Sequence, residues 1–565
     1  MSNIDDLFKL YKAAKLSING DLKSNGKVKV HDSLDEEDIE AGPEMPLEME
    51  DAGPEDEEGR FFGSGITGNT AEVLDFMDEQ DIDHTKLEKI DVAWLRKVAL
   101  NFEKRISKNA ELRAKFEDQP AKFMGSEADL DADIKTLSSL SEHPELYGEF
   151  AKLGCVSSLV SLLSHENTDI AIDAIEIIDE LTDEDVEAEQ EQWDVLVDAL
   201  VEADILNLLF ENILRLTEEL DSDRAGIYHV LSVLENLSSR SAIVSTIGKD
   251  AKLLPWLLSR IQKSEQPVTQ NKQYSAEILA ILLQSSPANR TQVFSLDGVD
   301  IFLQLLSPYR KRDPDKGTEE EEFVENLFDC LTCCVDDGEG KAKLLDAEGI
   351  ELCLIMLREG KMSKPRALRL LDHALGGPDG GGCCERLVEA AGLKTTFGLF
   401  MKKQDNEATE HLIGILSSML RSLPANEAAR IRLLAKFVEK DYQVLSRLVQ
   451  TRRDYVSRLK IADEEIRVER QTLSAQKEGD RADEWLSKRL DAGLYVLQTI
   501  DLILAWLVAE DEGSKTKIQN LLADRDEGLK DVRATLQERL DDMNASSEVE
   551  DPMLKDMMLA LIEHV

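Results

Sequence analysis

The sequence contains 565 residues, with 66 Lys and Arg against 114 Asp and Glu, so its formal net charge is −48. Nucleic-acid binding depends on Lys and Arg that neutralise phosphates, so this balance argues against direct nucleic-acid binding and favours basic protein partners. Hydrophobic residues make up 42% of the chain and aromatic residues 5%, which favours helices over sheets and, at this length, permits a large buried core.

The cysteines and the apolar runs indicate a soluble protein of the cytosol or nucleus. Four of the seven cysteines lie within helical patterns, as expected for reduced thiols packed as small apolar groups: Cys330, Cys333, Cys334 and Cys353. The N-terminus lacks the charged-then-apolar layout of a signal peptide. The longest apolar run, Leu494–Ala509, contains Gln498 and Asp501 and is shorter than the ~20 apolar residues of a membrane span, so we expect no membrane association.

Residues 1–60 are predicted to form a disordered acidic tail. Within them, His31–Glu58 contains many Asp and Glu, three Pro, and no Lys or Arg, so it cannot bury enough apolar surface to offset its ordering entropy. Such a tail either recruits partners or serves as a solvated linker. The glycine-rich stretch Phe61–Gly68 lacks the Gly-Lys-Ser/Thr sequence that a phosphate-binding loop requires.

Residues 61–128 are predicted to form an N-terminal helical cap. Thr70–Asp78 and Asp91–Asn109 have amphipathic patterns. The second of these predicted helices carries an apolar stripe formed by Leu95, Val98 and Phe102. A cap is expected here because terminal repeats must cover an otherwise exposed core.

The stretch Leu153–Asp185 is the unit that the following residues repeat. It contains two apolar runs with the 3.6-residue period of a helix. The polar break His165–Thr168 separates them, and either Asn167 or Thr168 is a candidate N-cap for the second run. Neither predicted helix can bury its apolar side alone, and the pair together leaves an apolar face that another pair must cover.

This pattern occurs six times at spacings of about 43 to 51 residues, close to the ~40–47 residues of armadillo and HEAT repeats. Each occurrence pairs a small residue with an aliphatic one: Gly154/Val156, Ala203/Ile205, Ala251/Leu253, Gly298/Val299, Gly349/Ile350 and Gly392/Leu393, with a register slip of one in the last three. A second apolar helix follows each later occurrence: Ile227–Leu237, Tyr274–Leu283, Phe323–Cys333, Ala367–Leu375 and His411–Leu420. We therefore predict an all-α, armadillo/HEAT-like right-handed helical solenoid of about six repeats over residues 129–423, with an extended exposed surface.

Residues 424–565 are predicted to form a C-terminal helical domain that caps the far end of the solenoid. Tyr455–Glu478 is a long polar helix candidate that could project or form a local coiled coil, and Trp485–Val508 is the most apolar helix pair of this region. Within the repeats, Arg310–Thr318 is a basic, proline-containing loop and Gly376–Gly382 is a glycine-rich loop.

The sequence contains no recognisable catalytic or metal-ligating constellation. Cys330, Cys333 and Cys334 share one helix face, but a structural zinc site pairs two close-spaced couples of ligands, so these thiols are interpreted as core. Asp372 and His373 are neighbours in a predicted helix and point about 100° apart, so they cannot form a dyad. We expect a protein that is not an enzyme and that binds no cofactor or metal.

The candidate site is a surface on the second helix of each unit. Alignment of the apolar runs places Glu180, Asn236, Cys330 and His373 at groove-lining positions. Of these, only Asn236 fits the asparagine ladder that holds an extended peptide backbone. A group of carboxylates at the start of the same face is expected to hold Lys and Arg of a basic peptide, with plain solvation as the alternative: Asp179, Glu180, Asp183, Glu184 and Asp185.

Eight stretches in order along the chain carry a resemblance to a known family. They are Val73–Asp83, Asn101–Phe116, Lys122–Leu130, Asn167–Asp183, Glu277–Gln284, Glu325–Leu331, Leu371–Gly380 and Leu490–Gln498. On these stretches the sequence resembles the beta-catenin-like protein 1 family, which comprises armadillo-repeat, spliceosome-associated nuclear proteins.

The resemblance implies a nuclear, non-enzymatic scaffold that binds basic nuclear-localisation-type segments of its partners. It implies association with the splicing machinery through a Myb-domain splicing factor and its ubiquitin-ligase-containing complex, and it is compatible with a homo-oligomer. The alternative is a karyopherin-like transport receptor for basic cargo. The sparse Asn positions and the lack of a basic autoinhibitory arm weigh against that alternative.

Overall fold

The computed structural model describes residues 89–249, 252–472, 481–545 and 552–565. The predicted acidic tail, residues 1–60, and the predicted helix Thr70–Asp78 lie outside the described residues. From Asp91 onward the described residues belong to one compact unit. They contain 26 α-helices, six short 3₁₀-helices and no strand, which confirms the all-α prediction.

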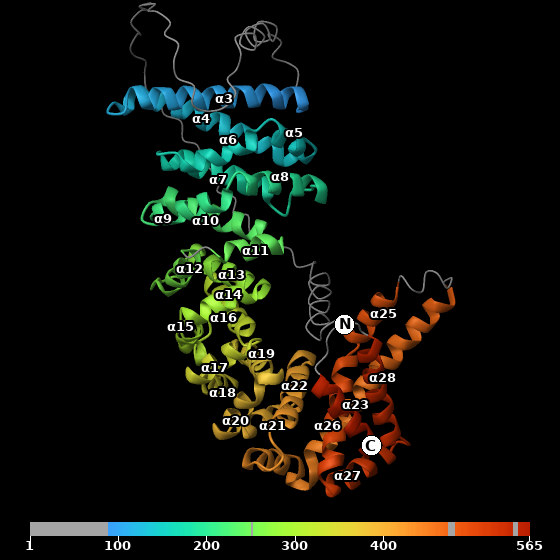
Figure 1. Cartoon of the computed structure of the whole chain (residues 1–565). Coiled ribbons are helices and arrows are strands. Elements are labelled where there is room, and N and C mark those ends of the chain that lie inside the picture. Colours follow the sequence, from blue (N-terminus) through green and yellow to red (C-terminus); the bar gives the residue numbers. More distant parts are fainter. Residues whose placement is uncertain (1–88, 250–251, 473–480, 546–551) are drawn as a thin grey trace, which may run out of the picture. The chain divides into compact units, whose positions relative to one another are not determined.

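The described chain begins with α3 (Val92–Lys115) and α4 (Met124–Thr136), which pack against each other. Asp91 caps α3, because its Oδ1 accepts hydrogen bonds from the backbone amides of Ala93 and Trp94 at 2.9 and 3.1 Å. In the predicted apolar stripe, Leu95 and Phe102 are buried and Val98 is half-buried. Because α4 also contacts α7 (Thr168–Thr182), these two helices adjoin the first repeat (Figure 1).

Residues 147–422 form six consecutive triplets of helices (Figure 1). The first helices are α5 (Tyr147–Lys152), α8 (Gln190–Glu202), α11 (Ser241–Ile247), α14 (Pro287–Ser295), α17 (Gly338–Asp346) and α20 (Gly381–Glu389). The second helices are α6 (Cys155–Ser161), α9 (Ile205–Arg215), α12 (Leu253–Gln262), α15 (Gly298–Leu306), α18 (Gly349–Glu359) and α21 (Leu393–Phe400). The third helices are α7, α10 (Asp221–Leu237), α13 (Gln270–Ser285), α16 (Glu319–Cys334), α19 (Ser363–Leu375) and α22 (Asn406–Ser422).

The two predicted runs of each unit correspond to the second and third helices. The sequence interpretation missed the first helix, which is only six residues long in α5 and seven in α11. Such short helices do not display enough turns for a 3.6-residue period to be recognised. The repeat is therefore the three-helix unit of armadillo proteins rather than a pair.

The recurring small residue has two physical origins. A residue in the left-handed region joins the first and second helices in the five triplets whose junction is described: Gly154, Asp204, Asp297, Glu348 and Ala391, with φ of 79°, 65°, 55°, 56° and 57°. Gly154 occupies this position itself, where glycine is favoured. In the last three triplets a glycine follows it, and a Cβ on Gly298, Gly349 or Gly392 would lie 2.3, 2.4 or 2.7 Å from the side chain five residues earlier. The small residue is the left-handed residue itself in the first triplet and the residue after it in the last three. Its distance to the aliphatic residue that follows is therefore one residue shorter in those three repeats.

The third helices contact one another in sequence order from α7 to α22, and we call this row the third-helix ladder. Aliphatic side chains fill its interior, including Ile178, Val230, Leu279 and Leu327, each at most 1% exposed. Burial of one such side chain contributes about 1.5–3 kcal/mol, so apolar contacts hold the ladder together. At its far end α22 contacts α26 (Leu494–Glu510).

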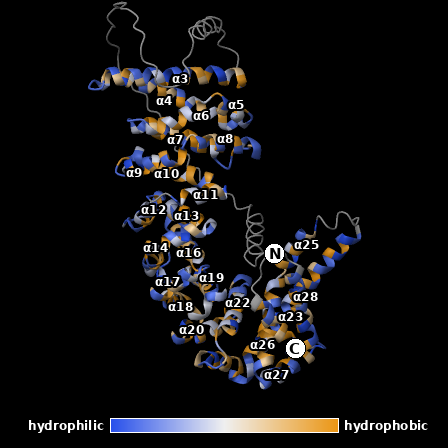
Figure 2. Cartoon of the chain, in the orientation of Figure 1, coloured by the Kyte–Doolittle hydropathy of each residue, from blue (hydrophilic) through white to orange (hydrophobic). Residues whose placement is uncertain are grey.

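The remaining helices are α23 (Ala428–Thr472), α25 (Ala482–Asp491), α26, α27 (Glu512–Ala523), α28 (Leu529–Ala545) and α29 (Pro552–His564). In Figure 2, α26 is among the most hydrophobic of them, and most of its side chains are buried. The predicted apolar pair is thus apolar in α26 but not in α25, where Trp485 alone is buried. α23 bends at 439–442, where three residues have φ between 53° and 61°. Beyond that bend, Tyr455, Leu459 and Ile466 are buried, Ile461 and Val468 are exposed, and α23 packs on α25, α26 and α27.

No single described helix is both long and apolar enough to cross a membrane. Two bent pairs reach that length and composition only in combination: Pro144–Lys152 with Cys155–Ser164, and Ala482–Asp491 with Leu494–Glu510.

Candidate functional site

The first helix of the ladder, α7, carries a row of carboxylates along one side. Asn167 starts the helix, and its Oδ1 accepts a hydrogen bond from the amide of Asp169 at 3.1 Å, which confirms one of the two predicted N-caps. Asp169, Asp173, Glu176 and Glu180 follow at intervals of three and four residues. That spacing places them on one helix face, and all four are at least partly exposed.

Asp179 is largely buried and is engaged by the next ladder helix. Nδ1 of His229 on α10 lies 2.9 Å from Asp179 Oδ2. The amide of Asn236 donates to Asp179 Oδ1 and to the hydroxyl of Thr182, both at 3.3 Å. The structure therefore brings Asp179 and Asn236 together, but the Asn236 side chain already binds α7 instead of standing free to hold a peptide backbone.

Among the described residues the other predicted carboxylates make no such contact with the next ladder helix. Glu180 is half-buried, and its Oε2 is a buried atom without a hydrogen-bond partner. Asp183 ends α7 and accepts a hydrogen bond from the amide of Asp185 at 2.7 Å. Glu184 and Asp185 are exposed beyond the helix, and among the described residues none of these four forms an ion pair with Lys or Arg.

Sequence reasoning missed the continuation of this surface across α10, α13 and α16. Glu235 accepts the hydroxyl proton of Tyr274, and Glu277 accepts a hydrogen bond from Gln273 at 2.8 Å. Burial raises the pKa of Glu277, and the carboxylates of Glu235 and Glu322 raise it further. Carboxylates on the preceding and following ladder helices thus act on Glu277.

We define the acidic stripe as Asp169, Glu176, Asp179, Glu180, Asp183, Glu235, Glu277 and Glu322. Among the residues that the structure describes, none of these carboxylates forms an ion pair with Lys or Arg. In that part of the chain their one basic partner is His229, which is charged only when protonated and lies beside Asp179 and, at 4.0 Å, Glu176. The stripe spans the ladder from α7 to the start of α16, and its uncompensated charge is available to a basic ligand.

Beyond the start of α16 the ladder neutralises its own charge. Glu325 pairs with Arg366, and Asp329 with Arg369, between α16 and α19. Nδ1 of His373 lies 3.0 Å from Oδ1 of Asp336, and Nδ1 of His411 lies 3.0 Å from Oδ2 of Asp372. His373 therefore sits in the paired half of the ladder, and neighbouring Asp372 faces the opposite repeat, as expected for adjacent helical residues.

The cysteines are core residues, as predicted. Cys330 and Cys334 are fully buried and Cys333 is half-buried, so Cys330 does not line a groove. Burial raises the pKa of the Cys353 and Cys384 thiols to about 12, which keeps them protonated and poorly nucleophilic at pH 7. Within the described ranges no group of three or more His, Cys, Asp or Glu is arranged to hold a metal ion.

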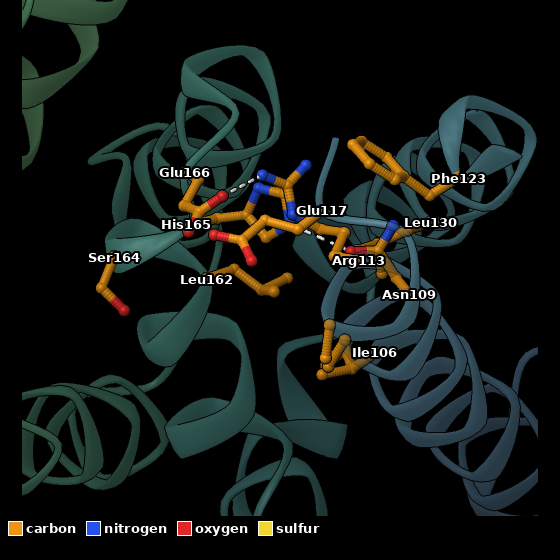
Figure 3. A pocket seen from close by; sticks show the side chains of 12 residues that line it. Ile106, Asn109, Arg113, Glu117, Phe123, Leu130, Leu162, Ser164, His165 and Glu166 are labelled. Atoms are coloured by element: carbon orange, nitrogen blue, oxygen red, sulfur yellow. Dashed lines mark hydrogen bonds and ion pairs between the residues drawn. The ribbon is translucent and has the colours of Figure 1, made fainter. Parts of the chain in front are cut away.

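A pocket of about 470 Å³ lies where α3 and α4 meet the first repeat (Figure 3). Its central cation, Arg113, pairs with Glu127 and Glu166 and lies 4.7 Å from the ring centroid of Phe123. His165 Nε2 lies 3.1 Å from Oδ1 of Asn109. The buried polar groups of this pocket are thus paired within the protein, and the acidic stripe is the stronger candidate site.

Comparisons with known proteins identify the family to which this chain belongs. A family model described as "Catenin-beta-like, Arm-motif containing nuclear" matches residues 71–537. The chain belongs to this family of beta-catenin-like armadillo proteins. It is 39% identical over 498 residues to the Beta-catenin-like protein 1 homolog of Schizosaccharomyces pombe, covering 87% of each chain. It is 38% identical over 463 residues to Beta-catenin-like protein 1 of Homo sapiens, covering 80% of this chain and 82% of the human protein.

Comparison with solved structures found similarity to armadillo repeat proteins at low sequence identity. A designed armadillo repeat protein in complex with the peptide (KR)4 is 14% identical, with a TM-score of 0.37, and the match covers 47% of this chain and 99% of that protein. A computationally designed armadillo repeat protein for modular peptide recognition is 15% identical, with a TM-score of 0.37, covering 49% and 99%.

Proposed function

We propose that this protein is a non-enzymatic nuclear scaffold of the splicing machinery that binds basic segments of partner proteins along the acidic stripe. The observation that supports this is the contrast within one ladder. Within the described residues the carboxylates of the acidic stripe have no Lys or Arg partner, whereas Glu325 and Asp329, which follow on α16, pair with Arg366 and Arg369. A ligand rich in Lys and Arg supplies the missing charge.

The partners belong to this proposal. Family membership supports a nuclear location, since the family description names nuclear proteins. By resemblance, the basic segments are those of a Myb-domain splicing factor and its ubiquitin-ligase-containing complex. A karyopherin-like receptor would instead be expected to present free Asn side chains on successive repeats, and Asn236 is already bonded to Asp179 and Thr182.

The test is calorimetric titration of the full chain with a peptide of four Lys-Arg repeats at low and at physiological salt. We expect binding that weakens with salt, because exposed charges are screened over about 8–10 Å. The double variant Glu180→Gln/Glu277→Gln removes two charges from the stripe and is expected to weaken binding at least tenfold.

A matched control separates the stripe from general acidity. Glu202→Gln/Glu339→Gln removes the same charge from exposed positions on α8 and α17 and should change the affinity less than twofold. Equal losses in both double variants would show that the peptide responds only to net charge, which would contradict the proposed site. Capture from nuclear extract that recovers no splicing proteins would contradict the scaffold assignment.

A further inference from the structure

A second pocket, of about 530 Å³, lies between the third and fourth triplets. Its walls come from the loop joining α12 to α13, the first turn of α13, the end of α15 with the 3₁₀-helix Ser307–Arg310, and the start of α16. Apolar and aromatic side chains form much of the lining, namely Pro267, Val268, Leu305, Pro308, Tyr309 and Phe323. The basic loop Arg310–Thr318 borders it through Arg312.

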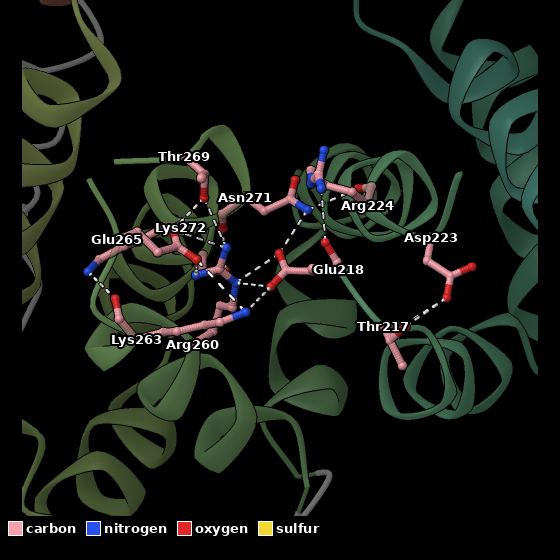
Figure 4. A network of polar contacts seen from close by, with 11 residues as sticks. Thr217, Glu218, Asp223, Arg224, Arg260, Lys263, Glu265, Thr269, Asn271 and Lys272 are labelled. Atoms are coloured by element: carbon pink, nitrogen blue, oxygen red, sulfur yellow. Dashed lines mark hydrogen bonds and ion pairs between the residues drawn. The ribbon is translucent and has the colours of Figure 1, made fainter. Parts of the chain in front are cut away.

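The carboxylates of this pocket are already neutralised. Glu265 pairs with the buried guanidinium of Arg260 at 3.1 Å and accepts the hydroxyl proton of Thr269 at 2.6 Å. Arg260 also pairs with Glu218 at 2.8 Å, as Figure 4 shows. Glu320 accepts from the hydroxyl of Tyr309 at 2.7 Å and pairs with Arg312.

One cation in the pocket has no such partner. Lys272, at the start of α13, is only 6% exposed. Its Nζ donates to the backbone carbonyl of Lys263 at 2.7 Å and lies 5.0 Å from the ring centroid of Phe323. No Asp or Glu in the described part of the chain forms an ion pair with it, and burial lowers its pKa. A buried ammonium with one carbonyl acceptor retains two N–H donors for a ligand.

We propose that this pocket, with Lys272 at its base and Arg312 at its rim, is a binding site for an acidic peptide segment of a partner protein. A Glu or Asp carboxylate of the segment meets Lys272 Nζ, and a neighbouring proline or aliphatic side chain packs on Pro308, Tyr309 and Phe323. This charge preference is opposite to that of the acidic stripe, so the site does not rest on the function proposed above.

The surroundings of the pocket support an anionic occupant. Residues 310–316 hold four basic residues against two aspartates, a local excess of positive charge in a chain whose net charge is −48. Gln262, Ser264, Gln266 and Gln304 also line the pocket, and their amides and hydroxyl can donate to carboxylate or backbone oxygens. An acidic segment held here gains charge-assisted hydrogen bonds within an otherwise apolar wall.

The test uses the full chain and a fluorescein-labelled peptide of four Pro-Glu repeats, followed by fluorescence anisotropy. Lys272→Met removes the ammonium but keeps an unbranched apolar side chain, and we expect at least tenfold weaker binding. Ser264→Trp fills the pocket without changing its charge and should have the same effect. Circular dichroism and thermal unfolding of both variants should match those of the unchanged protein, which shows that they remain folded, and binding of a peptide of four Lys-Arg repeats should be unchanged.

Lys311→Gln is the matched control, since it removes a charge from the same loop at a residue that does not line the pocket and pairs instead with Glu359. Binding that survives in Lys272→Met and Ser264→Trp, or that falls equally in Lys311→Gln, would overturn the proposal. If the Pro-Glu peptide fails to bind while a phosphoserine peptide binds in a Lys272-dependent manner, the assignment to a carboxylate is wrong.

Discussion

Arg452 and Asp501 form a two-point ion pair inside the C-terminal helices. Arg452 Nε lies 2.6 Å from Asp501 Oδ1, and Nη2 lies 3.1 Å from Oδ2. Their side chains are 3% and 0% exposed, and the pair ties α23 to α26. Burial raises the pKa of Asp501 to about 6, although the Arg452 guanidinium opposes the shift, so the carboxyl is mostly ionised at pH 7.

Asp501→Asn is expected to destabilise the protein by about 3–5 kcal/mol at pH 7.5, because it leaves the Arg452 charge buried without a carboxylate. Urea unfolding followed by circular dichroism measures the loss. The double variant Arg452→Met/Asp501→Leu removes both charges and should recover most of it. If the double variant is as unstable as the sum of its single changes, the ion pair is not the reason for the loss.

His229 is expected to make the contact between α7 and α10 sensitive to pH. Burial alone would lower its pKa below the ordinary 6.5, but Asp179, with Glu176 and Glu180 nearby, raises it above that value. A raised pKa in the folded state means that the stabilisation is present below pH 6.5 and is lost as the pH rises through the folded-state pKa. Titration of the His229 ring proton by NMR should give a lower pKa in Asp179→Asn, and an unchanged pKa would contradict the pairing.

Binding of a basic peptide to α7 should tighten between pH 6 and pH 8. Burial, and then the neighbouring Asp131 carboxyl, raise the pKa of Asp173 to about 7, while Lys135 lowers it. Asp173 therefore gains its negative charge across this range. One added surface charge contributes about 1 kcal/mol, or up to about fivefold in affinity. Calorimetry on Asp173→Asn should show this pH dependence reduced, and an identical profile in the variant would exclude Asp173 as its source.

Gly392→Ala is expected to cost about 1–3 kcal/mol by overpacking. Its Cβ would lie 2.7 Å from Cγ and 2.8 Å from the carbonyl oxygen of Leu387. Gly125→Ala in α4 is the matched control, because nothing lies within 4 Å of the added Cβ, and it should be neutral or stabilising by up to about 1 kcal/mol. Thermal unfolding of both variants decides whether close approach, rather than the loss of a glycine, accounts for the difference.

The third helices could be predicted from the sequence because each runs for three turns or more with one apolar side. α7, for example, repeats Ile170, Ala174, Ile177 and Leu181 at helical spacing, and all four are buried. The number of repeats and the fold followed from that period and its recurrence. The six-residue α5 and the seven-residue α11 offered no comparable pattern, although length does not explain why the 13-residue α8 was missed.

The arrangement of the site was harder to predict, because its partners are far apart in the chain. Asp179 and His229 are separated by 50 residues and Glu235 and Tyr274 by 39. Which side chains meet depends on the lateral register of adjacent ladder helices, and alignment of the apolar runs does not fix it. Composition indicated an excess of acidic groups, but it could not show that Glu325 and Asp329 pair with Arg366 and Arg369, while the acidic stripe has no Lys or Arg partner among the described residues.

The neighbouring residues Asp372 and His373 bond in opposite directions, one to His411 and the other to Asp336. Loss or gain of a single residue in α19 would turn everything downstream by about 100° about the helix axis and would break both bonds at once. This helix therefore tolerates substitutions far better than changes of length.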